Sequence, residues 1–317
     1  MKINVGIVGY GNLGKAVEGE LLKNNHFNLV AIFSRRTVKS SFGTIVEPFE
    51  NLSNFKTKIN IMLLCGGSMS DLEWQTREVL KDFDCINSFD THSKIEQELK
   101  SLTQIAEEHC HRAIICCGWD PGLFSIIRGL FYAISNKKPF SFWGKGISLG
   151  HSDAIKKQEG VVDAVQFTIP NQDAIKNAKK DCLAENTPCH YRECYVVTNI
   201  KNKDWLANKI KNIPNYFKNQ PTKVTFVSTN ELIFLKRKLN HQGMVFTKFK
   251  TTNNTKSELE FKVKMQSNPE FTAKIMVAYI NAVIKLKHDN QSGAYTLLDI
   301  PISYLFFENE NKLFELC

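Results

Sequence analysis

The sequence predicts an α/β protein: a Rossmann-like, doubly wound parallel sheet, followed by an α+β domain whose sheet is mainly antiparallel. Two observations carry this prediction. Up to residue 118, strand-like and helix-like segments alternate, which is the order of parallel sheets with crossover helices. After residue 122, segments such as Glu258 to Met265 alternate apolar and polar side chains, which is typical of antiparallel strands with one solvated face.

The elements of the first part follow from short apolar runs and from helical periodicity. Ser70 and Ser93 precede two of the expected helices and are residue types that cap helix N-termini. We expect strands at Asn4 to Val8, Leu29 to Phe33, Ile59 to Leu64, Asp84 to Asn87 and Ala113 to Cys117, and helices at Leu13 to Lys23, Asp71 to Lys81 and Lys94 to His109.

The second part is predicted in the same way. A long final helix is expected from Pro269 to about Lys287, with Asn268 as its cap. We expect a dinucleotide-binding domain in residues 1–118, completed by 268–317, and a substrate-binding and dimerisation domain in 119–267. The strands expected are His190 to Val197, Lys223 to Val227, Glu231 to Leu235, Met244 to Phe249 and Glu258 to Met265, and the helices lie near Gln172 to Cys182 and Asp204 to Asn212.

A glycine fingerprint follows the first strand directly. Gly9 permits a tight turn, Gly11 lets the backbone approach a pyrophosphate, and Gly14 lets the helix pack on the strand. The helix start offers free N–H groups and a positive dipole end to phosphate. The alternative is a glycine-rich turn that binds nothing. The segment predicted to bind a dinucleotide reads Gly9, Tyr10, Gly11, Asn12, Leu13, Gly14.

The second strand ends in Ser34, Arg35 and Arg36, where an NAD site usually has an acidic residue. Guanidinium groups match phosphate with paired donors, so this turn predicts a 2′-phosphate pocket and NADP as the cofactor. Only seven of the 41 basic residues are Arg, which makes two adjacent ones informative. The alternative is a solvated basic turn.

Ligands bind beyond the carboxyl ends of the strands in such sheets, so the residues there predict one wall of an active site. Asp90 and Asp120 lie at two neighbouring strand ends, and both are candidate catalytic residues. The alternative is that both belong to ordinary turns. The segments at these ends also include Cys65, Gly66, Gly67 and Ser68, then Ser88 to Asp90, and Gly118 to Gly122.

Composition excludes several other classes of protein. The net charge of +9 comes mostly from Lys residues in segments such as Lys201 to Lys211, which indicates a solvated surface rather than a nucleic-acid interface. No apolar stretch is long enough for a membrane span. The nine cysteines include no C-x-x-C pair, which indicates a reduced, cytoplasmic protein. His109 to Cys117 contains zinc-ligand types but no zinc-finger spacing, so no metal is expected.

Several segments together resemble the meso-diaminopimelate D-dehydrogenase family. The resemblance implies NADP-dependent, reversible deamination of the D-centre of meso-diaminopimelate, in bacterial lysine synthesis, by a homodimer. The segments that carry it are Val8 to Gly14, Ile32 to Arg36, Gly118 to Gly122, Phe142 to Gly144, Gly150 to Ala154, Ala164 to Pro170, Asn268 to Phe271 and Gln291 to Ala294.

The same resemblance assigns roles to residues. Arg192, Thr168 and His241, with Asn268 nearby, would hold the carboxylate of the L-centre, and Trp119 and Trp143 would contact substrate. The residues around His241, including Lys236 to Asn240, depart from the glycine- and histidine-rich loop of the family. Each of three residues also has a purely structural interpretation: Arg192 as an exposed charge on a strand, Asn268 as a helix cap and Trp143 as an aromatic residue of the core. His151 and Asp153 are interpreted as structural.

Two other functions are compatible with the same residues. One is a different Rossmann-type NADP oxidoreductase that acts on a related amino acid or sugar. The other is a non-enzymatic protein that senses the dinucleotide. The presence of Asp90, Asp120 and Arg192 in one chain argues against a loss of catalysis.

Overall fold

The computed structural model describes residues 2–184, 186–237, 240–307 and 315–316. The chain divides into two compact units. Unit 1 contains Met1–Ile126 and Pro269–Cys317, and unit 2 contains Ile127–Asn268. Each unit has its own sheets and its own hydrophobic clusters, and each is described separately below.

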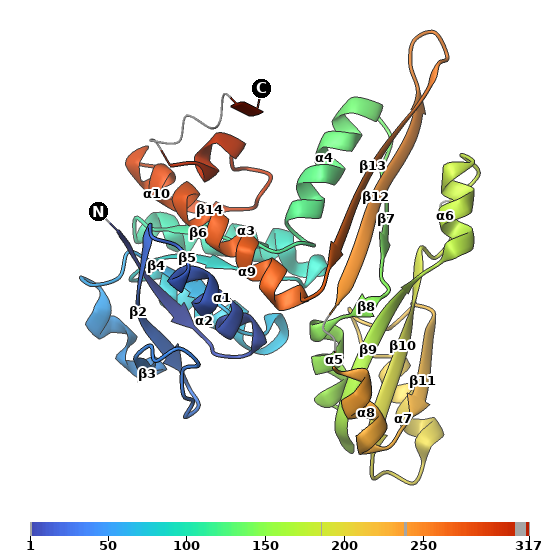
Figure 1. Ribbon diagram of the computed structural model, residues 1–317, viewed down its shortest axis with the longest axis horizontal. Coiled ribbons are helices and arrows are strands. Elements are labelled where there is room, and N and C mark those ends of the chain that lie inside the picture. Colours follow the sequence, from blue (N-terminus) through green and yellow to red (C-terminus); the bar gives the residue numbers. More distant parts are fainter. Residues whose placement is uncertain (1, 185, 238–239, 308–314, 317) are drawn as a thin grey trace. The chain divides into compact units, whose positions relative to one another are not determined.

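Unit 1 is built on a parallel sheet in which β1 lies next to both β2 and β4 (Figure 1). The strand order therefore reverses beside β1, and ligands of such sheets bind at the carboxyl ends flanking this reversal. Within the described residues the strand order is β14-β6-β5-β4-β1-β2-β3. The strands are β1 (Ile3–Val8), β2 (Phe27–Ser34), β3 (Val46–Pro48), β4 (Ile61–Leu64), β5 (Asp84–Asn87), β6 (Arg112–Ile114) and β14 (Gly293–Tyr295).

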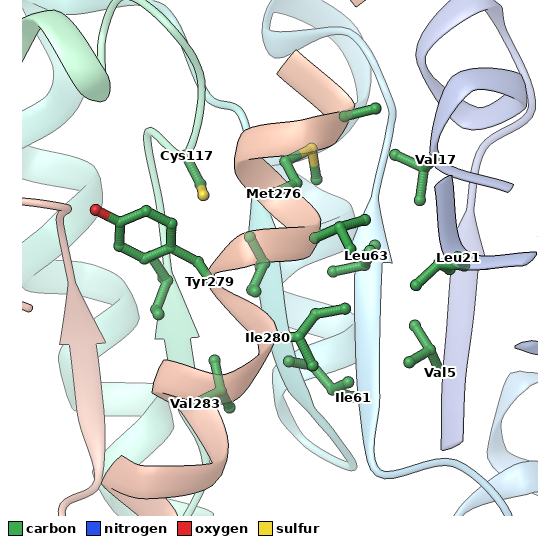
Figure 2. Packing of buried hydrophobic residues seen from close by; sticks show 14 of the residues in the cluster. Val5, Val17, Leu21, Ile61, Leu63, Cys117, Met276, Tyr279, Ile280 and Val283 are labelled. Atoms are coloured by element: carbon green, nitrogen blue, oxygen red, sulfur yellow. The ribbon is translucent and has the colours of Figure 1, made fainter. Parts of the chain in front are cut away.

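Helices cover both faces of this sheet, which is the doubly wound arrangement that the sequence predicts. One face packs on α1 (Asn12–Leu22), α9 (Asn268–Ala278) and α10 (Ile280–His288). Figure 2 shows Met276, Ile280 and Val283 beside the strand residues Ile61 and Leu63. The other face packs on α2 (Glu73–Leu80) and α3 (Ile95–Glu108). The C-terminal segment thus belongs to the same core as the N-terminal strands.

Unit 2 contains two smaller sheets that are mainly antiparallel, as predicted. The four-stranded sheet has the order β11-β10-β9-β8, in which only β10 and β11 run parallel. The three-stranded sheet has the order β13-β12-β7. The strands are β7 (Phe140–Trp143), β8 (Gly146–Ile147), β9 (Val161–Pro170), β10 (His190–Thr198), β11 (Thr222–Phe226), β12 (His241–Lys250) and β13 (Lys256–Met265).

Helices pack on both faces of the four-stranded sheet. α5 (Leu149–Lys156) and α7 (Lys203–Lys211) cover the face that carries Ala164, Cys194 and Val196. α8 (Thr229–Leu235) packs on the opposite face with Val165 and Phe167. α6 (Gln172–Lys179) packs on the three-stranded sheet. α4 (Leu123–Ser135) contains the boundary between the two units.

Three local predictions are wrong. Glu231 to Leu235 is helical, because Ser228 and Glu231 form a capping box that begins α8. The final helix is broken at Tyr279 into α9 and α10. Ser70 and Ser93 cap no helix: a π turn (Ser68–Leu72) precedes α2, and a 3-10 turn (His92–Lys94) precedes α3.

Candidate active site

The turn after β1 has the geometry that the glycine fingerprint predicts. Gly9 has φ +90°, and a Cβ at Gly14 would lie 2.2 Å from the Gly9 carbonyl oxygen, so the fold itself requires both glycines. Gly11 is different, because a Cβ there would meet no atom within 4 Å and its φ is −93°. Among the described residues, therefore, nothing requires glycine at position 11.

The open space at Gly11 fits the pyrophosphate of a dinucleotide. Gly11 is the N-cap of α1, and no side chain caps the first N–H groups of this helix. Its first turn also has no acidic residue that would repel an anion. Backbone donors and the positive end of the helix dipole thus face a space that a side chain would fill.

Tyr10 contributes to this turn through its backbone alone. Its side chain is 4% exposed, and its hydroxyl donates to the Glu18 carboxylate and accepts a hydrogen bond from the Ser41 N–H. The side chain is therefore held inside unit 1.

The turn after β2 places both arginines at the surface, but they have different partners. Arg35 pairs with Asp71, and its guanidinium lies 5.3 Å from the centre of the Trp74 ring. The Ser34 hydroxyl donates to the Arg36 carbonyl at 2.9 Å and accepts from the Arg36 N–H at 3.1 Å. Arg36 is exposed. The sequence does not predict that Asp71 and Trp74 contact Arg35, because it shows only that both residues follow the Cys65 to Ser68 segment.

The segment after β4, Cys65 to Ser68, is hydrogen-bonded to Asp90 through Ser68. The Asp90 N–H donates to the Ser68 hydroxyl at 3.0 Å, and the Ser68 side chain also hydrogen-bonds the Asp90 carboxyl group. Asp90 lies at an exposed edge, yet the atoms packed around its carboxyl group hinder hydration and raise its pKa. Ser68 and His92 oppose this rise only in part. Cys65 is buried, and burial raises the pKa of its thiol, so it stays neutral.

The loop that carries Asp120 lies next to the loop that carries Asp90. The Cys117 N–H donates to the Asn87 carbonyl at 2.8 Å, and a Cβ at Gly118 would lie 3.9 Å from the Ser88 Cβ. Gly122 closes the Asp120 loop with φ +133°. Trp119 is 8% exposed and packs edge-on against Phe124, with ring centres 5.2 Å apart. Both carboxylates therefore lie at neighbouring strand ends of the parallel sheet.

Unit 2 brings together the residues expected at the far end of a substrate. Thr168 on β9 lies opposite Arg192 on β10 and opposite Gly146 on β8. A Cβ at Gly146 would lie 2.5 Å from both Cα and Cγ of His241, so the glycine makes room for the histidine. His241 begins β12, and its Nδ1 accepts from the Gln242 N–H at 2.9 Å. Residues 238–239 of the preceding loop lie outside the described residues.

Arg192 is a buried cation without an acidic partner. It is 9% exposed, and no ion pair joins it to the rest of the described chain. Its Nε has no hydrogen-bond partner, and its guanidinium lies 5.8 Å from the centre of the Phe217 ring. Burial lowers the pKa of Arg192 to about 10, so the group remains charged at neutral pH. An uncompensated buried charge is costly, which indicates a site completed by an anion.

His190 and Gln166 are polar residues of this cluster that the sequence analysis missed. Burial lowers the pKa of His190 to about 4, with a smaller contribution from Arg192, and its Nδ1 has no hydrogen-bond partner. Its ring lies edge-on to Trp143, with centres 4.7 Å apart. Gln166 donates to the Thr168 hydroxyl at 3.3 Å, and its Oε1 has no partner. Both lie two residues before a predicted site residue, so the two-residue period of strands would have found them.

Asn268 and the other predicted positions are placed more simply. Asn268 is partly buried and is the first residue of α9, not the residue before it. His151 hydrogen-bonds Ser148 at 2.7 Å and packs against Tyr216 and Phe217.

Within the described ranges, no group of three or more His, Cys, Asp or Glu side chains has the geometry of a metal site. No helix in the same ranges has the length and apolar character of a bilayer span.

The glycine turn after β1, the two carboxylates at neighbouring strand ends and the buried cation are features that a nicotinamide-dependent oxidoreductase with an anionic substrate requires. Residues 118–267 match the family of diaminopimelic acid dehydrogenase C-terminal domains. The meso-diaminopimelate D-dehydrogenase of Acetivibrio thermocellus is 41% identical over 98% of this chain and 96% of its own length. The chain therefore belongs to the meso-diaminopimelate D-dehydrogenase family.

Two solved structures have the same fold over almost their whole length. The diaminopimelate dehydrogenase of C. glutamicum in complex with diaminopimelate is 32% identical, with a TM-score of 0.94, over 99% of this chain and 98% of that one. An engineered D-amino acid dehydrogenase bound to NADP+ is 31% identical, also with a TM-score of 0.94, over 99% of both chains.

Proposed function

We propose that this protein catalyses the reversible oxidative deamination of the D-centre of meso-2,6-diaminopimelate, a reaction of bacterial lysine synthesis. Substrate, NADP+ and water give L-2-amino-6-oxopimelate, ammonium, NADPH and a proton. The observation that carries the proposal is the buried Arg192 cation without an acidic partner, next to Thr168 and His241. A substrate with a second amino-acid end supplies the missing carboxylate.

Arg192 binds the carboxylate of the L-centre in this proposal. The guanidinium offers paired donors that match a carboxylate, and the Thr168 hydroxyl lies on the facing strand. His190 is neutral at pH 7, so it adds no competing charge. Trp143 packs on His190 and shapes the wall of the cluster, and Asn268 adds an amide at the start of α9.

Asp90 and Asp120 act at the opposite end of the substrate. Their carboxylates hold the ammonium of the D-centre and orient the water that attacks the imine carbon. The raised pKa of Asp90 makes it a stronger base than a solvated aspartate. NADP, when bound, would supply the hydride acceptor for the carbon that carries the amine. Trp119 fixes the loop of Asp120 by packing on Phe124.

The cofactor is NADP in this proposal, and residues of unit 1 hold it. The backbone from Gly9 to Gly14 binds the pyrophosphate. Ser34, Arg35 and Arg36 bind the 2′-phosphate, which requires Arg35 to share its guanidinium with Asp71. The segment Cys65 to Ser68, together with Asp90, forms the wall beside the nicotinamide. In this proposal unit 1, Met1–Ile126 with Pro269–Cys317, is the dinucleotide-binding domain, and unit 2, Ile127–Asn268, is the substrate-binding and dimerisation domain.

We infer a cytoplasmic homodimer for the assembled enzyme. The part of α4 that belongs to unit 2 exposes Leu130, Tyr132 and Ile134 by 53%, 56% and 52% of their surface. Leu130 and Ile134 are four residues apart and lie on the same side of the helix, and exposed apolar residues grouped in this way are typical of a subunit interface. The described cysteines are free, which fits a reducing compartment.

One assay tests this function. NADP reduction is measured with meso-diaminopimelate, its LL-isomer, D-alanine and L-alanine. Turnover of the meso compound in large excess over the others supports the proposal. Comparable turnover of simple D-amino acids points to a broader D-amino acid dehydrogenase. NADPH binding without any turnover points to a sensor of the dinucleotide.

A further inference from the structure

A buried carboxylate lies behind the dinucleotide turn. Glu18 on α1 is 0% exposed, and no cation of the described chain pairs with it. It is instead satisfied by two hydroxyl groups: Tyr10 donates to Oε2, and Ser40 donates to Oε1 at 2.5 Å. A buried charge held by neutral donors alone is unusual, because it must be compensated by well-made hydrogen bonds.

Both hydroxyl groups also hold the backbone of the loop that contains Ser40. The Tyr10 oxygen accepts from the Ser41 N–H at 2.6 Å. The Ser40 oxygen accepts from the N–H groups of Phe42 and Thr44 at 3.0 and 2.9 Å. Each hydroxyl has one hydrogen, and both hydrogens point to Glu18. An amide at position 18 would present a donor to one of them, so the arrangement requires a carboxylate.

This group of three side chains, the Glu18 tether, fixes a loop whose other contacts are apolar: Val38 packs on the core of unit 1, and Phe42 lies beside Gly19 of α1. Phe42 is 60% exposed, and Gly43 has φ +87°. The loop follows the turn of Arg35 and Arg36 directly. β2 fixes one end of that turn at Ser34, and the tether fixes the other end at Ser40. The tether also begins at Tyr10, inside the predicted pyrophosphate turn.

We propose that Glu18, Tyr10 and Ser40 are positioning residues that preform the arginine turn and thereby set the preference for NADP over NAD. A turn closed at both ends loses less conformational freedom when it receives a phosphate. Without the tether, the turn is ordered only when a ligand binds to it, and the entropy lost then weakens binding. Only the nucleotide with a 2′-phosphate uses this turn, so NADPH binding is weakened and NADH binding is not. This inference rests on the proposed cofactor site at Ser34 to Arg36.

The test uses the full-length protein with NADPH or NADH alone, followed by nucleotide fluorescence. Tyr10→Phe, Ser40→Ala and Glu18→Gln should each raise the Kd for NADPH by about threefold to tenfold, the effect of one lost hydrogen bond. The Kd for NADH should stay within about twofold in Ser40→Ala, because Ser40 lies outside the turn proposed to bind the pyrophosphate. Tyr304→Phe is the matched control, since Tyr304 donates to Asp289 at 2.5 Å elsewhere in unit 1. It should change neither Kd.

A second measurement guards against variants that fail to fold. Hydrogen exchange of the amides of Ser41, Phe42 and Thr44 in the cofactor-free protein should accelerate in Tyr10→Phe and Ser40→Ala, with the sheet amides unchanged. The inference is overturned if the Kd values for NADPH and NADH rise by the same factor, or if neither value changes. Arg35→Ala combined with Arg36→Ala separates the two claims. If the double arginine variant still prefers NADPH over NADH, the proposed cofactor site at Ser34 to Arg36 is wrong. If the double variant loses this preference but the three tether variants keep it, the cofactor site stands and the proposed role of the tether is wrong.

Discussion

Two arginines in different units lie over aromatic rings, and they differ in exposure and in whether an acidic side chain pairs with them. Arg35 in unit 1 lies over Trp74 and is paired with Asp71. Arg192 in unit 2 lies over Phe217 and has no acidic partner in the described chain. The candidate cofactor residues are thus already held by protein groups, whereas the candidate substrate residues leave polar atoms unsatisfied. We propose that the Arg35 side chain is held in place before the cofactor binds, whereas the charge of Arg192 is compensated only by the substrate.

The largest expected effect concerns the carboxylates of unit 1. Asp90→Asn and Asp120→Asn should each lower turnover of meso-diaminopimelate by about 100-fold to 10,000-fold, because a positioned acid or base contributes that much. NADPH affinity should change little, since neither side chain is needed for phosphate. Steady-state kinetics and nucleotide titration measure the two quantities. Wild-type turnover in both variants would reduce these residues to turn formers.

A pair of arginine substitutions tests whether the missing partner of Arg192 matters for stability. Arg77 donates to both carboxylate oxygens of Glu98, at 3.0 and 2.6 Å. Arg77→Met should lower the free energy of unfolding by about 1–3 kcal/mol, because it leaves a buried carboxylate unpaired. Arg192→Met should leave stability unchanged or raise it, because it removes an uncompensated charge. Chemical denaturation of both variants without ligands gives the comparison. A large loss of stability in Arg192→Met would show that the charge has a partner.

His190 should make unit 2 sensitive to acid. Its pKa is lowered from 6.5 to about 4, so the unfolded chain binds the proton more readily than the folded one. Stability from this group is present above about pH 6.5 and is lost as pH falls through 4, by about 3 kcal/mol in all. His190→Gln should flatten the curve of unfolding free energy against pH in this window. An unchanged slope would contradict the burial of the neutral ring.

The smallest expected effect is the loss of one phosphate contact in unit 1. Arg35→Ala and Arg36→Ala should each weaken NADPH by about tenfold, as expected for a charged hydrogen bond, and NADH very little. Competition titrations with the two nucleotides measure the ratio. If wild-type protein binds NAD and NADP equally, the assignment of this turn to the 2′-phosphate is wrong.

The parts of unit 1 that could be predicted from sequence depend on the backbone. Gly9, Gly11 and Gly14 act through the absence of a side chain, and their spacing along one strand–turn–helix unit is visible in the sequence. Strand ends in a parallel sheet meet at one edge, so Asp90 and Asp120 could be placed together as well. The pairing of Arg35 with Asp71 could not, because it joins two turns through side chains.

The failures of prediction also have physical causes. Glu231 to Leu235 is a short, mostly apolar run of a kind that strands and helices share, and the capping box at its start begins a helix. Ser70 has the right type for a cap, yet a π turn occupies its position. In unit 2, the facing of Thr168 and Arg192 depends on the register of two strands that are distant in sequence. A single sequence carries no signal for that register beyond the resemblance to a family.

The central claim is that Arg192 binds the carboxylate at the L-centre of the substrate. The most direct test compares how strongly the protein prefers a substrate with that carboxylate over one without it. Wild-type protein and Arg192→Met are compared in NADP reduction with meso-diaminopimelate and with D-alanine. The proposal predicts a higher Michaelis constant for the meso compound and a fall of about 100-fold in its kcat/KM relative to D-alanine, because buried donors otherwise discriminate strongly against a missing polar group. An unchanged ratio would show that the distal carboxylate is bound elsewhere.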